Sequence, residues 1–498
     1  MKARDIQVKL EDDSAGSHGR GLGPALWVTA LVVFGVLCTS LAAVRSPHTP
    51  DGAGYFGIAY RLLIAGRIED PVSFIGSPWP MTSVHWPPGY SLALATFLWL
   101  GISPTTAARA LGFLAGLSAV VGGAMVVGPA TKKKAGSALA ALWLATCPSL
   151  LLGSVSCTSD ALFSAIVIAA LWVSRVALVH GHAMTLVLLG ALAGGAFSVR
   201  WVGIVLVALT TLVAWNAGTK SPLPQRLAQL VWFGLGVLPI IIPIEVWRIA
   251  SGDGPRAAAG PLMFTARSHC VGALATAVTV APGVFAFLIF GCTLLRPTPQ
   301  PPLDRREIAL HAGWVLGALG LHLVASVRYT IDPISSRVLL PLLPSLVVLL
   351  LSALAARTRL TRWRPRMLPV ATIMAVFFVV QVAVGARSLF RRDSQQWPEI
   401  PRPVASAIAA DEHLLSVIPS GSLVLTSVPA LASLRPDLHW RRLQRAPNTA
   451  AVNLAEALAA HPEHISGFVV WDGAPPLGAP LEHMVCVESV CRAMLAPR

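Results

Sequence analysis

Long apolar segments, separated by short polar or basic stretches, make up most of the chain before residue 386. A helix needs about 20 mainly apolar residues to cross a bilayer, and its backbone groups then bond within the segment. At that length the pattern predicts about eleven membrane-spanning helices. We expect them near residues 25–44, 107–128, 136–153, 161–179, 184–199, 201–215, 227–247, 272–294, 308–327, 338–356 and 368–386. The sequence therefore predicts an all-α polytopic membrane bundle, in which two short spans meet at Arg200.

One shorter apolar run, residues 88–100, has a different expected role. Lysine and arginine are retained on the cytoplasmic side of a membrane. The triple lysine at residues 132–134 lies on that side only if residues 88–100 do not cross. We therefore expect an interfacial helix here, within a first outer loop at residues 45–106. The same rule places a tail of residues 1–24 in the cytoplasm and the carboxyl end outside.

The character of the chain changes after the last predicted span. Residues 387–498 contain more Pro, Asp, Glu and His and have only short apolar runs. Residues 422–428 and 465–471 favour strands, and residues 450–460 favour a helix. We predict a small extracytoplasmic α/β domain that follows the membrane domain at residues 25–386.

Composition and charge narrow the class of protein. Apolar residues form 55% of the chain and charged residues only 12%, which excludes a soluble surface. The net charge of +15 comes from short basic clusters between spans, without one basic face carrying interleaved aromatics. This charge is therefore a topology signal and not a nucleic-acid site. We predict a multi-pass cell-membrane protein that contacts membrane lipid and binds no nucleic acid.

The seven cysteines do not form a disulfide framework in a chain of this length. Cys486 and Cys491 lie close together in the predicted outer domain, where an oxidising compartment permits a bridge. The sequence leaves open whether they are bridged.

Unusual polar residues collect on the predicted outer side. Asp51 follows the first span, and Asp160 heads a later one. A charge near membrane depth is costly and is usually placed for function. An outward-facing site explains why the predicted cytoplasmic side carries nothing comparable apart from its basic clusters. The candidate site residues are Asp51, Tyr55, His85, Asp160, Arg200, Arg328 and Arg337.

Several short motifs, taken in order, resemble a known family. They are DGAGYFGIAYRLLIAG at 51–66, HWPPGY at 85–90, SDALF at 159–163, RWVG at 200–203 and SRVLLP at 336–341. Over residues 25–356 the chain resembles the GT-C glycosyltransferases, in particular the bacterial relatives of protein O-mannosyltransferases and aminoarabinose transferases. The resemblance implies transfer of a sugar from a polyprenyl-phosphate donor to an acceptor hydroxyl at the outer membrane face.

The resemblance also implies that Asp51 is the catalytic base. A carboxylate would take the proton of the acceptor hydroxyl as its oxygen attacks an anomeric carbon with oxocarbenium character. A single base and a phosphate leaving group favour inversion. The alternative is that Asp51 only caps the helix that follows Pro50. Many family members carry a second acidic residue beside the first, whereas this chain has Gly52, which leaves the acceptor class open.

Arginines are the candidates for holding the phosphate of the donor. A guanidinium group can bind phosphate oxygens in a bidentate fork. Arg200, Arg328 and Arg337 are the candidates, and Arg337 matches the family position before a leucine- and proline-rich span. The alternative is that these side chains reach the lipid headgroups or pair with nearby carboxylates.

The remaining candidates have two interpretations each. Tyr55 and His85 are candidate substrate contacts, although His85 also fits a packing role at the interface. Asp160 fits a helix cap and a site role equally well. Together with Asp51 it could share a divalent cation. The chain has no zinc-binding spacing, phosphate-binding glycine loop or dinucleotide fingerprint, so no certain cofactor and no nucleotide-sugar donor are predicted.

Two other classes of protein fit the apolar composition. A transporter or a flippase for lipid-linked saccharides would have inverted repeats and charges in mid-span, and neither is evident. A scaffold would use the outer domain to bind a partner. The sugar, the acceptor and the isoprenoid length stay open, because a fold does not carry substrate identity.

Overall fold

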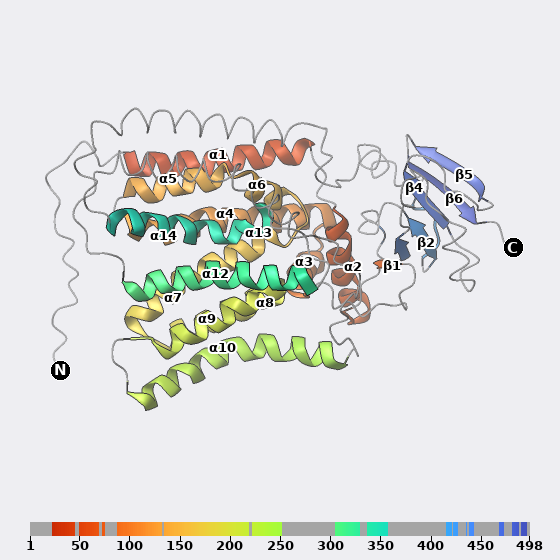
Figure 1. The fold of residues 1–498 in the computed structure, drawn as a ribbon. Coiled ribbons are helices and arrows are strands. Elements are labelled where there is room, and N and C mark those ends of the chain that lie inside the picture. Colours follow the sequence, from red (N-terminus) through yellow and green to blue (C-terminus); the bar gives the residue numbers. More distant parts are fainter. Residues whose placement is uncertain are drawn as a thin grey trace.

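The computed structural model describes a helical bundle and a smaller sheet beside it (Figure 1). The described residues are 22–44, 49–68, 72–74, 87–131, 134–218, 222–250, 304–328, 336–356, 415–420, 422–426, 435, 438–442, 468–472, 481–487 and 490–495.

Within these ranges, five helices are long and apolar enough to cross a membrane. They are α1 (Leu22–Val44), α4 (Pro104–Thr131), α7 (Asp160–His180), α10 (Leu223–Ala250) and α12 (Arg305–Arg328). A sixth candidate is the pair α5 (Lys134–Ala145) and α6 (Pro148–Val155), which is bent by 60° where Pro148 starts a new helix. The chain is therefore a multi-pass membrane protein. The spans predicted at 272–294 and 368–386 lie outside the described residues, so the number eleven stays a prediction.

The two short predicted spans correspond to α8 (Ala183–Val199) and α9 (Ile204–Trp215). Between them, Arg200 has an extended backbone, and a single 3-10 turn, η2 (Trp201–Gly203), follows. A Cβ atom on Gly203 would lie 2.5 Å from the carbonyl carbon of Ala196, so the turn requires glycine there. The predicted break at Arg200 is confirmed, and it places this side chain at a helix end.

Two helices of the segment between α1 and α4 cover one end of the bundle, the end nearest the sheet (Figure 1). They are α2 (Pro50–Ala65) and α3 (Gly89–Trp99). With 11 residues, α3 is too short to span a bilayer, as predicted for this segment. A buried cluster that includes Tyr55, Phe56, Tyr90 and Leu94 joins the two helices. This packing gives α2, which carries Asp51, a defined position on the bundle.

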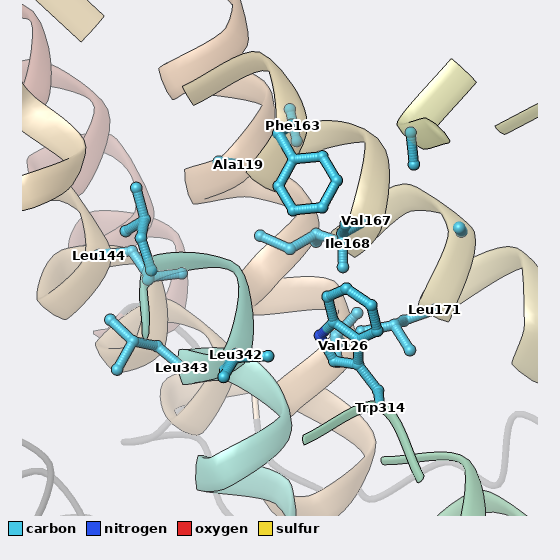
Figure 2. Close-up of a cluster of buried hydrophobic side chains, with 14 of the residues drawn as sticks. Ala119, Val126, Leu144, Phe163, Val167, Ile168, Leu171, Trp314, Leu342 and Leu343 are labelled. Atoms are coloured by element: carbon cyan, nitrogen blue, oxygen red, sulfur yellow. The ribbon is translucent and has the colours of Figure 1, made fainter. Parts of the chain in front are cut away.

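A buried core connects α7 to the segment that carries Arg337 (Figure 2). Phe163 on α7 packs against Trp314 on α12, with ring centroids 6.4 Å apart. Trp314 is fully buried, and its Nε1 donates a hydrogen bond to Pro341 O at 3.2 Å. Pro341 lies in η3 (Leu340–Leu342), between α13 (Ser336–Leu339) and α14 (Leu343–Ala356). This bond helps to fix the end of α13 next to α7.

The C-terminal region contributes most of a six-stranded sheet with the order β1-β3-β2-β4-β6-β5. Its C-terminal strands are β2 (Leu423–Thr426), β3 (His439–Arg442), β4 (Phe468–Asp472), β5 (Leu481–Val487) and β6 (Val490–Leu495). β2 is parallel to β3 and β4, and β6 is antiparallel to β4 and β5. β2 and β4 match the two predicted strands. The predicted helix at 450–460 and the boundary at residue 386 lie outside the described residues.

One strand of this sheet comes from the segment between α2 and α3. β1 (Val72–Phe74) pairs in parallel with β3, with Val72 opposite Trp440. No local pattern in the sequence predicts this pairing, which ties residues 72–74, after α2, to the C-terminal strands. At the other edge, β5 and β6 place Cys486 opposite Cys491. A bridge between these two residues stays a prediction.

Candidate active site

The start of α2 is attached to the segment between α6 and α7 by one threonine. Thr49 Oγ1 accepts a hydrogen bond from Gly52 N at 2.9 Å and donates one to Cys157 O at 2.9 Å. Thr49 is thus the N-cap of α2, and Pro50 occupies its first turn, as is common at helix starts. The alternative that Asp51 only caps this helix does not agree with the structure, because Thr49 provides the cap and Asp51 bonds elsewhere.

Gly52 allows this close approach. A Cβ atom at this position would lie 2.9 Å from Cys157 Cβ and 3.1 Å from Cys157 O. Any side chain here would push the first turn of α2 away from the segment beneath it. The contact gives a physical reason why this chain has no second acidic residue after Asp51.

Arg337 joins the two carboxylates that the sequence singled out. Its Nη2 donates to Asp51 Oδ2 at 3.1 Å, and its Nε donates to Asp160 Oδ2 at 2.7 Å. The side chain of Asp51 is 30% exposed, that of Arg337 is 20% exposed and that of Asp160 is 4% exposed. The bridge therefore runs from a buried carboxylate to an accessible one.

A second arginine completes this group. Arg200 Nη1 lies 2.8 Å from Asp160 Oδ1, as an ion pair without the alignment of a hydrogen bond. Its guanidinium carbon also lies 6.0 Å from the ring centre of Phe163. We call Asp51, Asp160, Arg200 and Arg337 the Asp–Arg cluster. Its charges balance, and balance is what a buried carboxylate such as Asp160 requires.

Tyr55 lies beside the cluster but is directed into the protein. It is 2% exposed, and its hydroxyl donates to Ser159 Oγ at 2.9 Å. Its ring packs on Tyr90, with centroids 4.7 Å apart. Burial, with a smaller contribution from the Asp51 carboxylate, raises the pKa of the Tyr55 phenol above its ordinary value. The described contacts of Tyr55 are therefore with Ser159, next to Asp160, and with Tyr90, and its predicted contact with substrate stays a prediction.

Two predicted site residues are not placed by the structure. His85 lies outside the described residues. Arg328 is the last residue of α12, and only its backbone position is described. Their proposed contacts with substrate stay predictions.

The arrangement does not fit a divalent cation shared by Asp51 and Asp160. A cation between the two carboxylates would compete with the Arg337 guanidinium, which bonds to both. In the described part of the chain, no three His, Cys, Asp or Glu residues are grouped as a metal would require. We therefore derive no metal-dependent step from this site.

A second polar group lies at the opposite end of α7, about 22 Å from Asp160 along the helix. Arg175 Nε is 3.2 Å from Glu307 Oε1, and His311 Nδ1 is 2.9 Å from Ser345 Oγ. Glu307 and His311 are buried. The prediction that only basic clusters occupy that end is wrong. A signal was present, because Glu307 and His311 are four residues apart and share one face of a helix.

Comparison with known proteins gives one family match and several solved structures with a similar fold. Residues 85–247 match the family described as Dolichyl-phosphate-mannose-protein mannosyltransferase. The structure superposes on ArnT from Cupriavidus metallidurans bound to undecaprenyl phosphate, with a TM-score of 0.56 and 15% identity. That match covers 95% of this chain and 99% of ArnT. The chain is similar to the GT-C membrane glycosyltransferases.

A second solved structure gives the same result. The archaeal oligosaccharyltransferase AglB from Archaeoglobus fulgidus, in complex with an inhibitory peptide and a dolichol-phosphate, matches with a TM-score of 0.53 and 12% identity. The match covers 92% of this chain and 70% of AglB. A sequence comparison with curated proteins finds no match. At these identities the superpositions show the fold. With the family match, they confirm the predicted resemblance and the prediction of a glycosyltransferase.

Proposed function

We propose that this membrane glycosyltransferase moves a sugar from a polyprenyl-phosphate donor to an acceptor hydroxyl at the outer face of the cell membrane. The observation that carries the proposal is the Arg337 bridge, which holds a guanidinium group 3.1 Å from the candidate base Asp51. The family name refers to a dolichyl-phosphate sugar, and two relatives were solved with polyprenyl phosphates. The amino-terminal tail is then cytoplasmic and the C-terminal domain extracytoplasmic.

In this proposal Asp51 is the general base. Its carboxylate takes the proton of the acceptor hydroxyl while the acceptor oxygen bonds to the anomeric carbon. The bond from that carbon to the phosphate oxygen breaks, and polyprenyl phosphate leaves with the electron pair. Because the acceptor attacks opposite the leaving group, the anomeric configuration inverts.

Exposure separates the roles of the charged side chains. Arg200 and Arg337 are 27% and 20% exposed, so a ligand can reach both, and guanidinium groups suit phosphate oxygens. Asp160 is only 4% exposed and forms ion pairs with both arginines. We therefore assign phosphate contact to Arg200 and Arg337 and no substrate contact to Asp160.

A transporter or flippase is the weaker alternative. Transport sites usually lie near the bilayer midplane between discontinuous helices. The Asp–Arg cluster lies instead at the ends of α2, α7, α8 and α13. The comparisons also match sugar transferases, so the alternative is not favoured.

The proposal is tested with a deletion strain and with the purified full-length protein. We expect the strain to lack one sugar from its envelope glycans, lipids or glycoproteins, as seen by mass spectrometry. We expect the purified protein to release polyprenyl phosphate from the matching donor, in membranes that supply the acceptor. Complementation with wild type should restore the sugar, whereas Asp51→Asn should not. Unchanged envelope sugars together with no release of polyprenyl phosphate would refute the proposal.

A further inference from the structure

The two bonds of Arg337 differ in how easily a ligand can replace them. The bond from Nε to Asp160 is 2.7 Å long and ends on a carboxylate that is 4% exposed. The bond from Nη2 to Asp51 is 3.1 Å long and ends on a carboxylate that is 30% exposed. Breaking a buried pair leaves an uncompensated charge, whereas an exposed pair contributes little. Arg337 is therefore anchored on one side and exchangeable on the other.

The Asp160 carboxylate, which anchors Arg337, is held by further contacts. Arg200 pairs with the second oxygen of Asp160, so both carboxylate oxygens face guanidinium groups. Ser159, next to Asp160, accepts the hydrogen bond of the Tyr55 hydroxyl. These contacts hold the Asp160 carboxylate, and through it the Arg337 guanidinium, in one orientation.

The backbone that carries Asp51, the exchangeable partner of Arg337, is also fixed. Thr49 caps α2 and bonds to Cys157 O, which holds the first turn of α2 in place. Separation of Asp51 from Arg337 thus needs only a rotation of the Asp51 side chain. No displacement of α2 is required.

We propose that Nη2 of Arg337 bonds to Asp51 when the donor is absent and to the donor phosphate when it is bound, and that Asp160 is the positioning residue for this exchange. The inference rests on the proposed function, because it takes the anion to be a polyprenyl phosphate. A guanidinium group forms charge-assisted, often bidentate bonds with phosphate as well as with carboxylate, so a bound phosphate can replace the partly exposed Asp51 carboxylate. Donor binding then releases Asp51 toward the acceptor hydroxyl, so the base becomes available only when a donor is in place.

If Asp51 and the donor phosphate compete for Arg337 Nη2, replacing Asp51 has an effect that charge repulsion between Asp51 and the phosphate would not produce. Removing the Asp51 carboxylate should strengthen polyprenyl phosphate binding, because the competitor for Nη2 is gone. Loss of a negative charge could strengthen anion binding by long-range electrostatics as well. Under exchange, however, the gain depends on Arg337, and a double-mutant cycle measures that dependence.

The experiment measures the Kd for undecaprenyl phosphate, on the full-length protein in nanodiscs. The variants are wild type, Asp51→Asn, Arg337→Gln and the double variant. If Arg337→Gln is not monodisperse, Arg337→Lys takes its place. Lysine keeps the positive charge, but its single ammonium group lacks the separate Nε and Nη2 donors with which Arg337 bonds to Asp160 and to a second anion. We expect Asp51→Asn to bind about 3- to 10-fold more tightly in the wild-type background and to change Kd by less than about twofold without Arg337.

Asp160→Asn tests the positioning role. If Asp160 orients Arg337, its replacement weakens undecaprenyl phosphate binding and removes the gain caused by Asp51→Asn. A merely structural Asp160 would lower Tm and leave that gain intact, which would overturn the positioning role.

The outcomes separate the exchange from the proposed function. Exchange is overturned if the wild type binds undecaprenyl phosphate but Asp51→Asn does not tighten binding. It is also overturned if the gain is equal with and without Arg337. In both cases the proposed function stands. A wild type that neither binds undecaprenyl phosphate nor releases it from a donor overturns both.

Discussion

Arg337 Nη2 lies 3.1 Å from Asp51 Oδ2, although 286 residues separate the two in the chain. This contact joins the start of α2 to the start of α13. It places the candidate base and the candidate phosphate ligand within one hydrogen-bonded group. The candidate site is therefore an assembly of helix ends from distant parts of the chain.

Replacement of Asp51 by Asn should abolish sugar transfer while the protein still folds. Asn keeps the size of the side chain but cannot accept the acceptor proton, and loss of a general base costs about 10²- to 10⁴-fold in rate. The measurement is the rate of polyprenyl phosphate release. Asp304→Asn is the control, since Asp304 is exposed and caps α12, a role that Asn can also fill. Full activity of Asp51→Asn would exclude Asp51 as the base.

The two aspartates should differ in their effect on stability. Asp160→Asn leaves two arginines without their shared carboxylate, and breaking such a buried pair costs about 3–5 kcal/mol. Asp51→Asn removes a partly exposed pair, worth about 0–1 kcal/mol. Thermal unfolding in the same detergent should therefore give a much lower Tm for Asp160→Asn. Equal Tm values would contradict the assignment of Asp160 as the buried anchor.

A methyl group at position 52 should disturb the site without changing any charge. In Gly52→Ala the new Cβ would lie 2.9 Å from Cys157 Cβ, so the start of α2 must move, and Asp51 with it. Overpacking of this kind costs about 1–3 kcal/mol, and we also expect a loss of transfer activity. The matched control is Gly35→Ala, which has nothing within 4 Å of the new atom. Wild-type activity and Tm in Gly52→Ala would show that the contact is not required.

Stability at alkaline pH should depend on Tyr55. Burial raises the pKa of the folded phenol, whereas the unfolded side chain ionises near its ordinary value of about 10. The contribution of Tyr55 is thus fully present below about pH 10 and is lost as the pH rises toward the folded pKa. Tyr55→Phe should lower Tm at neutral pH, because Ser159 loses its donor, but should reduce the further loss above about pH 10.

Tyr60→Phe on the same helix is the control for this titration, because Tyr60 is only half-buried. The measurement is Tm as a function of pH for wild type and both variants. An unchanged alkaline slope in Tyr55→Phe would show that another group dominates the loss of stability.

The apolar pattern alone predicted the membrane class, the positions of most described helices of the bundle, the short helix α3 and the break at Arg200. It did not predict the 60° bend between α5 and α6. Helix formation in a membrane is local, because each segment must satisfy the hydrogen bonds of its own backbone groups. A long apolar run therefore predicts a helix without knowledge of its neighbours. The motifs also indicated Asp51, Asp160, Arg200 and Arg337 individually. They did so because charged residues near membrane depth are costly and are usually placed for function.

Only the tertiary structure decided how these residues combine. The Arg337 bridge between Asp51 and Asp160 depends on how α13 packs against α2 and α7, which no local pattern encodes. The same holds for Arg175 with Glu307, and for β1, whose three residues pair with a strand far along the chain. Ion pairs and strand pairing are contacts between segments, so their partners are selected by packing and not by the sequence around each residue.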